Sequence, residues 1–403
     1  MKKILIVYTT AGAGHKKAAL AIKEALEELA PKDTEVSVIN TLDFASPFFR
    51  WVYLKGYLVI INKFPKFWGN AYDLTNNVFF DRITAGLRRW SNWINSKKMR
   101  EYLIALGPDV IVSTHFFPAE VVSDLKRKNM LHSRLITVVT DYRLHLWWLA
   151  DQVDAYVVGS EQAKEDLLRH GTVPARIRVF GIPVGPAFVK PLDRKNIRDR
   201  IDLRDAIPVL LVIGGGLGLG PFEDIIKIID SVSAPFQIIA VCGGNEKLVK
   251  ELEGLKPSLK HAIRIFGFVN NVHELMEISS LLLSKSGGVT TAESLAKELP
   301  MIVIDPIIGQ ETRNRDFLTS HGASLKVNGL SELKGVLENL VGDPGKIQKM
   351  KDSIAKIKKP MACYDVAKMA VEMAATSLAR EKPHSSENLT TNQDSSPGTP
   401  VIQ

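Results

Sequence analysis

The densest group of residues that could do chemistry lies in residues 284–314, SKSGGVTTAESLAKELPMIVIDPIIGQETRN. Between an apolar strand pattern and a helix pattern it holds a short turn of small residues: Ser286, Gly287, Gly288 and Thr290. Glycines let backbone N–H groups approach an anion, and a helix N-terminus carries partial positive charge. The turn therefore predicts a phosphate site. The alternative is an ordinary helix start.

The polar residues that follow could hold the rest of a nucleotide sugar. Glu293 lies one turn into the predicted helix, where a carboxylate can accept both hydroxyls of a ribose. Gln310 and Glu311 follow the apolar residues 301–304 and could bind sugar hydroxyls. The alternatives are a glutamate that favours the helix dipole and an exposed first turn of a helix. The residues alone leave both open.

A second glycine turn, Gly214, Gly215 and Gly216, follows the apolar run Val209–Ile213. Such a turn by itself is weak evidence for a phosphate site. It has no well-placed acidic partner for the ribose of a dinucleotide, which disfavours an oxidoreductase. It has no Gly-Lys-Ser or Gly-Lys-Thr either, so it is not the phosphate loop of an ATPase.

A base could come from the first part of the chain. His15 ends the glycine turn at residues 11–14, and its near-neutral pKa suits proton removal from an acceptor hydroxyl. The alternative is an imidazole that caps the helix or binds phosphate. Asp43 could orient His15, act as base itself, or cap a helix. Three further polar residues lie at predicted strand ends: His115, Asp141 and His145. Their spacing matches no zinc site, and no Asp-x-Asp motif occurs in the sequence.

The net charge of +8 is concentrated in residues 46–100, where ten lysines and arginines face two aspartates. The same window is rich in large aromatic residues. Basic residues among such aromatics suit an anionic membrane surface. The alternative is a solvated basic face over an ordinary aromatic core. Nucleic acid is disfavoured, because no recognised binding module accompanies the charge. The candidate membrane and acceptor residues are Trp51, Tyr53, Trp68, Arg88, Arg89 and Trp90.

The elements that must position these residues alternate between strands and helices. Apolar strand patterns occupy residues 3–9, 35–39, 109–113, 135–140, 155–158 and 177–179, and then 209–213, 237–241, 263–266, 281–283 and 301–304. This rhythm predicts an α/β protein with two Rossmann-like domains that face each other across a cleft. The predicted domains are 1–185 and 205–360, joined by a linker at 186–204.

The end of the chain is predicted to differ from the domains. A helix at 361–380 is expected to return to the first domain, and the Ser-, Thr-, Asn- and Pro-rich residues 381–403 to form a disordered tail. The two cysteines, Cys242 and Cys363, make neither a disulfide framework nor a metal cluster, which favours a reducing compartment such as the cytosol. No apolar run reaches the roughly twenty residues of a membrane-spanning helix.

Taken together and in order, several segments resemble the two-domain (GT-B) glycosyltransferases that make glycosyl diacylglycerols. That family includes the bacterial processive diacylglycerol glucosyltransferases and the chloroplast monogalactosyldiacylglycerol synthases. The transferase that adds N-acetylglucosamine to lipid I is a more distant likeness. The resemblance covers roughly residues 1–378. It rests on TAGAGHKKAALAI, TVVTDYRLHLWW, YVVGSEQAKEDLL, IRVFGIPVGPAF, IGGGLGLGP, GFVNNVHELM, SGGVTTAESLAKELPMIVI and GQETRN.

The resemblance implies transfer of a hexose from UDP-glucose or UDP-galactose to diacylglycerol, on the cytoplasmic face of a membrane. It implies neither a metal nor a cofactor beyond the UDP-sugar. The basic aromatic window would meet the anionic membrane and the lipid. By position, the family's donor-site roles fall as follows: the backbone of Phe268 and Val269 on uracil, Ser286–Thr290 and Gly214–Gly216 on diphosphate, Glu293 on ribose, and Gln310 with Glu311 on the hexose. His15 and Asp43 fall on or near the reacting centre.

Two departures leave acceptor and sugar identity open. The family turn is commonly Gly-Gly-Gly-His, where this chain has AGAGH, and KSGG replaces a lysine-proline or lysine-alanine version. One alternative is a related enzyme of the same architecture, either a transferase that moves N-acetylglucosamine to an undecaprenyl lipid or a UDP-sugar epimerase. Another is a membrane-associated UDP-sugar sensor without catalysis. A dinucleotide enzyme is the third.

Overall fold

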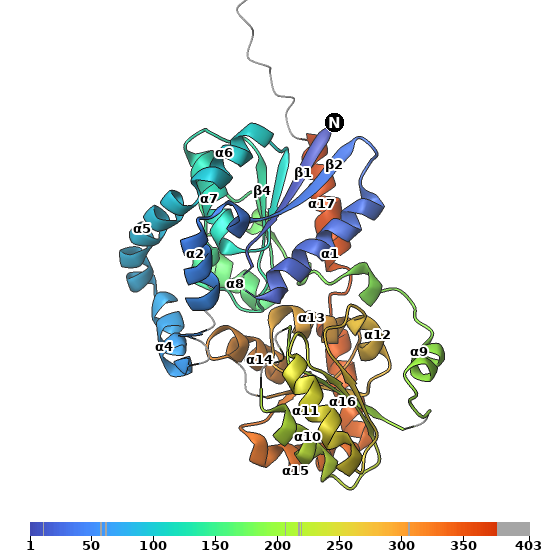
Figure 1. The fold of residues 1–403 in the computed structure, drawn as a ribbon. Helices are drawn as coiled ribbons and strands as arrows, with labels where there is room; N and C mark the ends of the chain where they lie inside the picture. Colours follow the sequence, from blue (N-terminus) through green and yellow to red (C-terminus); the bar gives the residue numbers. More distant parts are fainter. Residues whose placement is uncertain are drawn as a thin grey trace, which may run out of the picture.

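The computed structural model describes residues 1–376, apart from residues 11, 57–58, 61–62, 206, 217, 219 and 305–306. The chain forms two halves, each with a six-stranded parallel sheet covered by helices (Figure 1). The predicted α/β class with two Rossmann-like units is confirmed. The predicted tail at 381–403 and the last four residues of the predicted helix at 361–380 lie outside the described residues. The domain boundaries stay a prediction.

The first sheet has the strand order β2–β1–β3–β4–β5–β6. Its strands are β1 (Lys2–Tyr8), β2 (Thr34–Asn40), β3 (Val110–Ser113), β4 (Arg134–Val138), β5 (Ala155–Val157) and β6 (Ile177–Arg178). The helices of this half are α1 (Ala13–Leu29), α2 (Pro47–Trp51), α4 (Pro65–Thr75), α5 (Val78–Asn95), α6 (Lys97–Leu106), α7 (Phe116–Arg127) and α8 (Glu161–Arg169). A short π-helical turn, η2 (Val52–Gly56), follows α2.

The second sheet has the order β12–β11–β10–β7–β8–β9. Its strands are β7 (Val209–Ile213), β8 (Gln237–Val241), β9 (Ile263–Phe266), β10 (Leu281–Ser284), β11 (Met301–Val303) and β12 (Ser324–Lys326). Its helices are α10 (Phe222–Asp230), α11 (Glu246–Leu255), α12 (Val272–Glu277), α13 (Gly288–Ala296), α14 (Gln310–Ser320), α15 (Leu330–Val341) and α16 (Pro344–Ile357). Helix α9 (Arg194–Arg200) lies in the predicted linker.

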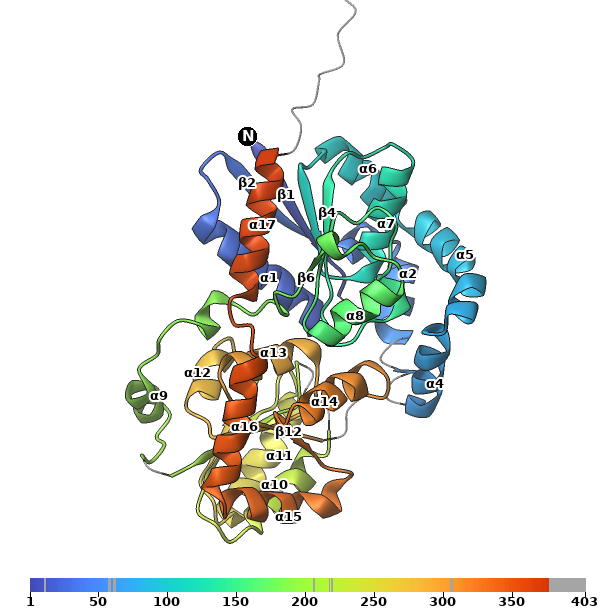
Figure 2. The same cartoon turned by 180° about the vertical axis from the view of Figure 1, so that it is seen from behind.

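The central strands of both sheets are runs of buried Val, Ile and Leu, as a parallel sheet covered on both faces requires. In the first half, α1 covers one face, while α6 and α7 cover the other. The last helix, α17 (Ala362–Thr376), crosses back to the first half and packs beside α1 (Figure 2). The predicted return of the C-terminal helix is therefore confirmed.

The strand orders predict where ligands should bind. In open parallel sheets the binding crevice lies at the carboxyl ends of the strands, where the strand order reverses. The reversal falls between β1 and β3 in the first sheet, and between β7 and β10 in the second. His15 lies in the first turn of α1, after β1, and the turns after β7 and β10 carry Gly214–Gly216 and Ser286. The topology therefore places these predicted site residues at the two reversals.

Candidate active site

The turns at the two reversals meet at the junction between the halves. A β-carbon placed on Gly14 would stand 3.6 Å from Val289 Cγ2, and one placed on Gly216 would stand 3.5 Å from Ala13 Cβ. A β-carbon on Gly288 would collide with the carbonyl oxygen of Thr140, so this close approach requires glycine. The first turn of α1 therefore lies between the two glycine turns of the second half.

His15 is held at this junction as a neutral imidazole. Its Nδ1 lies 2.7 Å from the carbonyl oxygen of Thr114 and 3.0 Å from Oγ1 of Thr140. A carbonyl can only accept, so Nδ1 carries the hydrogen and Nε2 is the nitrogen that can take a proton. Burial lowers the pKa of His15 to about 4. The ring is therefore a proton acceptor at neutral pH.

The ring of His15 packs against a second imidazole, that of His115. The rings of His15 and His115 meet edge to face, with centroids 4.5 Å apart. His115 caps α7 by accepting the N–H of Phe117 on Nδ1, and its Nε2 lies 3.3 Å from the hydroxyl of Tyr53. Burial holds the pKa of His115 well below its usual range, and the neighbouring His15 lowers it further. Tyr53, predicted to face the acceptor, thus links η2 to the two histidines.

The side chain of Asp43 makes its hydrogen bonds with residues other than His15. It belongs to the short 3-10 turn η1 (Thr41–Phe44), and its carboxylate is mostly exposed. Its partners are the side chain of Asn40 and the guanidinium of Arg50, both at 3.3 Å. Asp43 was predicted to orient His15 or to act as base, and its role stays a prediction.

The predicted phosphate and sugar contacts of the second half are tied to each other. Ser286 Oγ donates to the carbonyl oxygen of Glu311 at 2.7 Å. The Glu311 carboxylate accepts the N–H of Ile307 at 2.6 Å, and burial raises its pKa. A β-carbon on Gly287 would lie 3.6 Å from Glu311 Oε1. The start of α14, with partly buried Gln310, therefore lies beside the turn before α13.

Glu293 lies in α13 with only 4% of its surface exposed. Its carboxylate pairs with Nζ of Lys17 on α1 at 2.9 Å, across the junction between the halves. Thr290, three residues earlier on α13, is partly buried. The residue predicted to bind ribose is therefore present at the junction and is held there by a lysine that sequence reasoning did not select.

The other predicted donor contacts line the carboxyl edge of the second sheet. Gly215 and Gly216 are exposed after β7, and Gly214 is partly covered by Phe222. Gly215 has a φ of +72°, a left-handed conformation that favours glycine. After β9, the side chain of Phe268 is 69% exposed, while Val269 packs against the core. Of these turns, the one after β7 approaches α1 of the first half at Gly216.

Asn314 connects the two halves and was missed by sequence reasoning. It is completely buried, and its Oδ1 accepts the N–H of Tyr142 at 2.9 Å. Its Nδ2 lies 3.1 Å from the carbonyl oxygen of Ser286 and 3.3 Å from Oδ1 of Asp141. Burial raises the pKa of Asp141 to about 6. Asn314 lies one turn after Gln310, so helical spacing could have placed it on the same face.

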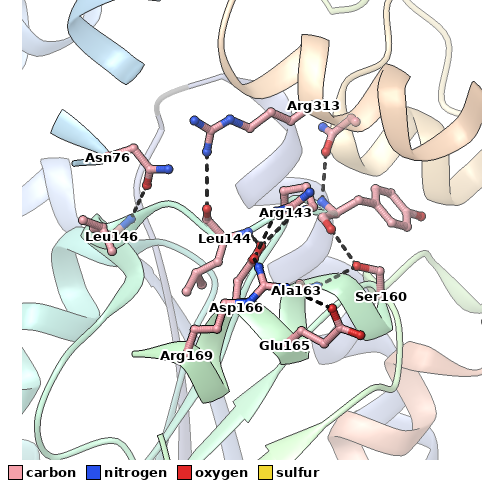
Figure 3. Close-up of polar contacts among 12 residues, drawn as sticks. Asn76, Arg143, Leu144, Leu146, Ser160, Ala163, Glu165, Asp166, Arg169 and Arg313 are labelled. Carbon is pink, nitrogen blue, oxygen red and sulfur yellow. Dashed lines mark hydrogen bonds and ion pairs between the residues drawn. The ribbon is translucent and has the colours of Figure 1, made fainter. Parts of the chain in front are cut away.

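The segment at residues 141–148 after β4 is held from both halves (Figure 3). Within the first half, the guanidinium of Arg143 binds Asp166 at 2.8 Å. From α14, Arg313 reaches across to the carbonyl oxygen of Leu144 at 3.4 Å. The contacts of Arg313 and Asn314 fix the segment that carries Asp141 against the second half.

Helix α5 carries its apolar face outward. Five large side chains recur on one face and are 53–68% exposed: Phe79, Ile83, Leu87, Trp90 and Ile94. The polar face turns inward onto Glu120 of α7, which is 5% exposed. Asn92 donates to Glu120 at 2.6 Å, and Arg88 and Arg89 each lie 3.5 Å from it. This is the reverse of an ordinary surface helix.

The other predicted membrane residues divide between surface and interior. Trp51 on α2 is 60% exposed, whereas Trp68 is partly buried. Arg88 and Arg89, predicted to face a membrane, instead pair with acidic residues of the first half. Among the described helices, none is long and apolar enough to cross a membrane. In the described part of the chain, no three His, Cys, Asp or Glu side chains form a group that could hold a metal ion.

Residues 15–184 match the family described as monogalactosyldiacylglycerol (MGDG) synthase, and residues 209–368 match the glycosyltransferase family 28 C-terminal domain. The two matches together span both halves of the chain. The chain is a family 28 glycosyltransferase. The predictions of this family and of a hexosyltransferase are thereby confirmed.

Curated relatives of this glycosyltransferase match over most of their length. A processive diacylglycerol beta-glucosyltransferase of Bacillus licheniformis is 26% identical over 364 residues, covering 88% of this chain and 91% of the relative. A protein of the same name from Bacillus cereus is 28% identical over 363 residues, covering 89% and 90%.

Solved structures share the fold of this glycosyltransferase. MurG of Acinetobacter baumannii has a TM-score of 0.62 at 13% identity, covering 92% of this chain and 100% of that one. A complex of Staphylococcus aureus MnaA with UDP has a TM-score of 0.59 at 18% identity, covering 91% and 95%. At these identities the likeness concerns the GT-B fold alone.

Proposed function

We propose that this glycosyltransferase moves a hexose from UDP-glucose or UDP-galactose to diacylglycerol, at the cytoplasmic face of an anionic membrane. The observation that carries the proposal is the outward apolar face of α5, which α4 connects to the junction between the halves (Figure 1). Burial of each large apolar side chain in lipid favours binding by about 1.5–3 kcal/mol. Transfer to a water-soluble acceptor needs no lipid-binding surface, and it would not account for the five exposed apolar residues of α5.

The apolar surface adjoins the donor half through α4. A β-carbon on Gly69 would collide with Ile308, and one on Gly309 would come within 2.8 Å of the ring of Tyr72. Asp73, also on α4, pairs with Arg313 of α14 at 2.8 Å. A lipid headgroup at the foot of α4 would therefore be near the start of α14, where Gln310 and Glu311 are proposed to bind the hexose.

The donor is proposed to bind with its diphosphate at the N-terminus of α13. There the backbone of residues 286–290, together with Gly214–Gly216, would hold the phosphates, and Glu293 would accept the ribose hydroxyls. The backbone at Phe268 and Val269 would meet the uracil. The positive end of the helix dipole would stabilise the charge that develops on the leaving diphosphate.

The chemical step is proposed to be a displacement at the anomeric carbon. The acceptor hydroxyl forms the new C–O bond, the bond to UDP breaks, and the hydroxyl proton passes to Nε2 of His15. The neutral state of His15 supports this role, because a base must be unprotonated to act. Asp43 remains a second candidate base, and its exposure next to α2 leaves it accessible to a lipid headgroup.

The proposal is tested by steady-state turnover with UDP-glucose and UDP-galactose and with diacylglycerol in anionic vesicles. We expect His15→Ala to lower kcat by about 100-fold or more, as loss of a general base does. Glu293→Ala should mainly raise KM for the donor. Asn328→Ala, at an exposed distant turn, is the matched control. If both site variants turn over like the wild-type protein, the site assignment fails.

The alternatives are separated when the same assay also offers UDP-N-acetylglucosamine as a donor and lipid I as an acceptor. Transfer of N-acetylglucosamine to lipid I without any hexosyl diacylglycerol would replace the proposed acceptor and donor. Conversion of the free UDP-sugar into its epimer would replace transfer altogether. Binding of UDP-sugar and vesicles without turnover on any acceptor would indicate a sensor. Each result contradicts the proposed function.

A further inference from the structure

Lys17 and Glu293 form an ion pair between the halves, inside the proposed donor site. The Nζ–Oε1 distance is 2.9 Å, and the side chain of Lys17 keeps 45% exposure while that of Glu293 keeps 6%. Among the described residues, the side chain that pairs with the carboxylate of Glu293 is that of Lys17. A buried carboxylate that loses its partner is costly, so something must replace Lys17 whenever it leaves.

The position of Lys17 on α1 directs it toward the donor half. Residues three or four apart share one face of a helix, so Lys17 follows Ala13 and Gly14 on the same side. Ala13 faces Gly216, and Gly14 faces Val289. Lys17 is therefore on the face of α1 that approaches both glycine turns proposed to hold diphosphate.

A bound donor would compete with Lys17 for Glu293. The two hydroxyls of a ribose can take the place of the ammonium as hydrogen-bond donors to the carboxylate. Glu293 is the sixth residue of α13, so the N-terminus of that helix is about 7.5 Å away along its axis. A lysine is a flexible point charge that binds phosphate well. The displaced ammonium would thus have the donor diphosphate within reach.

We propose that Lys17 is a donor-site residue supplied by the first half: it holds Glu293 before the donor binds and transfers to the diphosphate when the ribose takes Glu293. This inference rests on the proposed UDP-sugar donor. The exchange keeps Glu293 paired in both states. It also gives the leaving diphosphate a cation from the half that carries His15.

The test compares uridine and UDP as probes of the full-length protein, with wild type, Lys17→Ala and the control Lys16→Ala. Lys16 is the exposed neighbour of Lys17. Uridine presents the ribose alone, whereas UDP also presents the diphosphate. Dissociation constants are measured by calorimetry for UDP and by ligand-observed NMR for uridine, and unfolding midpoints confirm that each variant is folded.

Lys17→Ala should bind uridine several-fold more tightly than the wild-type protein, because the competing ammonium is gone. The ratio by which UDP is preferred over uridine should fall by about tenfold, which is typical for loss of one charge-assisted contact to phosphate. Lys16→Ala should change neither quantity. Both changes together support the exchange.

Three results would overturn the inference. An unchanged preference for UDP would mean that Lys17 does not reach the diphosphate. Uridine binding that is no tighter, or is undetectable in both proteins, would mean that no competition occurs. If the wild-type protein binds no UDP at all, the proposed donor fails and the inference falls with it. The first two outcomes leave the proposed function standing.

Discussion

Helices α1 and α5 belong to the same half and are both amphipathic, yet they face in opposite directions. Helix α1 buries Ala19, Ile22 and Leu26 against the sheet, while Lys16 and Lys17 lie on its exposed side. Helix α5 buries arginine and asparagine against Glu120 and exposes Leu87 and its apolar neighbours. Amphipathic periodicity therefore identifies a helix with two faces, and what lies beneath decides which face turns inward.

The difference has a physical cause that lies far along the chain. A carboxylate on α7 cannot be buried under an apolar face, because an unpaired buried charge is strongly unfavourable. Glu120 thus requires the polar face of α5 to turn inward, and the apolar face of α5 therefore turns outward. Helix α1 instead packs on the apolar surface that β1 and α17 offer. The comparison predicts that matched changes in the two helices will act on different properties.

The largest contrast should come from removing one buried and one exposed apolar side chain. Ile22→Ala should lower the free energy of unfolding by about 2–5 kcal/mol, because it leaves a cavity in the core. Leu87→Ala should change it by less than about 0.5 kcal/mol. Denaturant unfolding of both variants measures this. Equal losses would mean that α5 buries its apolar face in solution.

Binding to vesicles should depend on an exposed leucine of α5 and not on an exposed leucine of α1. Leu87→Asn should weaken binding to anionic vesicles by roughly tenfold or more, since one leucine buried in lipid contributes about 1.5–3 kcal/mol. Leu29→Asn is the matched control, because Leu29 is an exposed leucine on α1. Sedimentation with vesicles measures both. The outward face of α5 has no role in membrane binding if the two variants bind alike.

Removing the buried carboxylate should loosen α5 without touching α1. Glu120→Ala leaves Arg88, Arg89 and Asn92 without their shared acceptor, which should cost about 1–3 kcal/mol. Glu101→Ala, on the exposed side of α6, serves as control. Amide hydrogen exchange should rise in α5 and stay unchanged in α1. Unchanged exchange in α5 would show that Glu120 does not fix its orientation.

The smallest expected effect is the loss of unfolding free energy at lower pH, through protonation of His15. The folded pKa of His15 is about 4, below the ordinary 6.5, so His15 favours folding fully above pH 6.5 and loses this contribution as the pH falls toward 4. Relative to His15→Gln, the wild-type protein should lose about 1–2 kcal/mol of unfolding free energy between pH 7 and pH 5. Parallel pH curves for the two proteins would mean that His15 titrates normally.

The sequence predicted the sheets well because their signals are local. Runs such as Val209–Ile213 can only be buried strands, and the glycine turns that follow them lie at the strand-order reversals. The identity of the family could also be predicted, because the motifs occur jointly and in order. Contacts between distant residues could not, since no local pattern encodes them. Lys17 with Glu293 is one such contact, and Asn314 with Tyr142 is another.

The basic aromatic window shows the limit most clearly. Composition left a membrane surface and a solvated basic face open, and the family resemblance favoured the membrane, with Arg88 and Arg89 among the candidates to meet it. In the structure these arginines pair with Glu120 instead, and the apolar residues on either side of them in sequence, Leu87 and Trp90, face outward. The sequence could not distinguish these two uses of arginine, because the partner carboxylate lies on another helix.

The most direct test of the account measures hexose transfer from UDP-glucose and UDP-galactose to diacylglycerol in anionic vesicles, with the lipids analysed by mass spectrometry. Wild-type protein, Leu87→Asn and Leu29→Asn are compared side by side. The account predicts a hexosyl diacylglycerol from the wild-type protein and Leu29→Asn, and a rate at least about tenfold lower for Leu87→Asn. Absence of any hexosylated lipid, or equal rates for all three proteins, would contradict it.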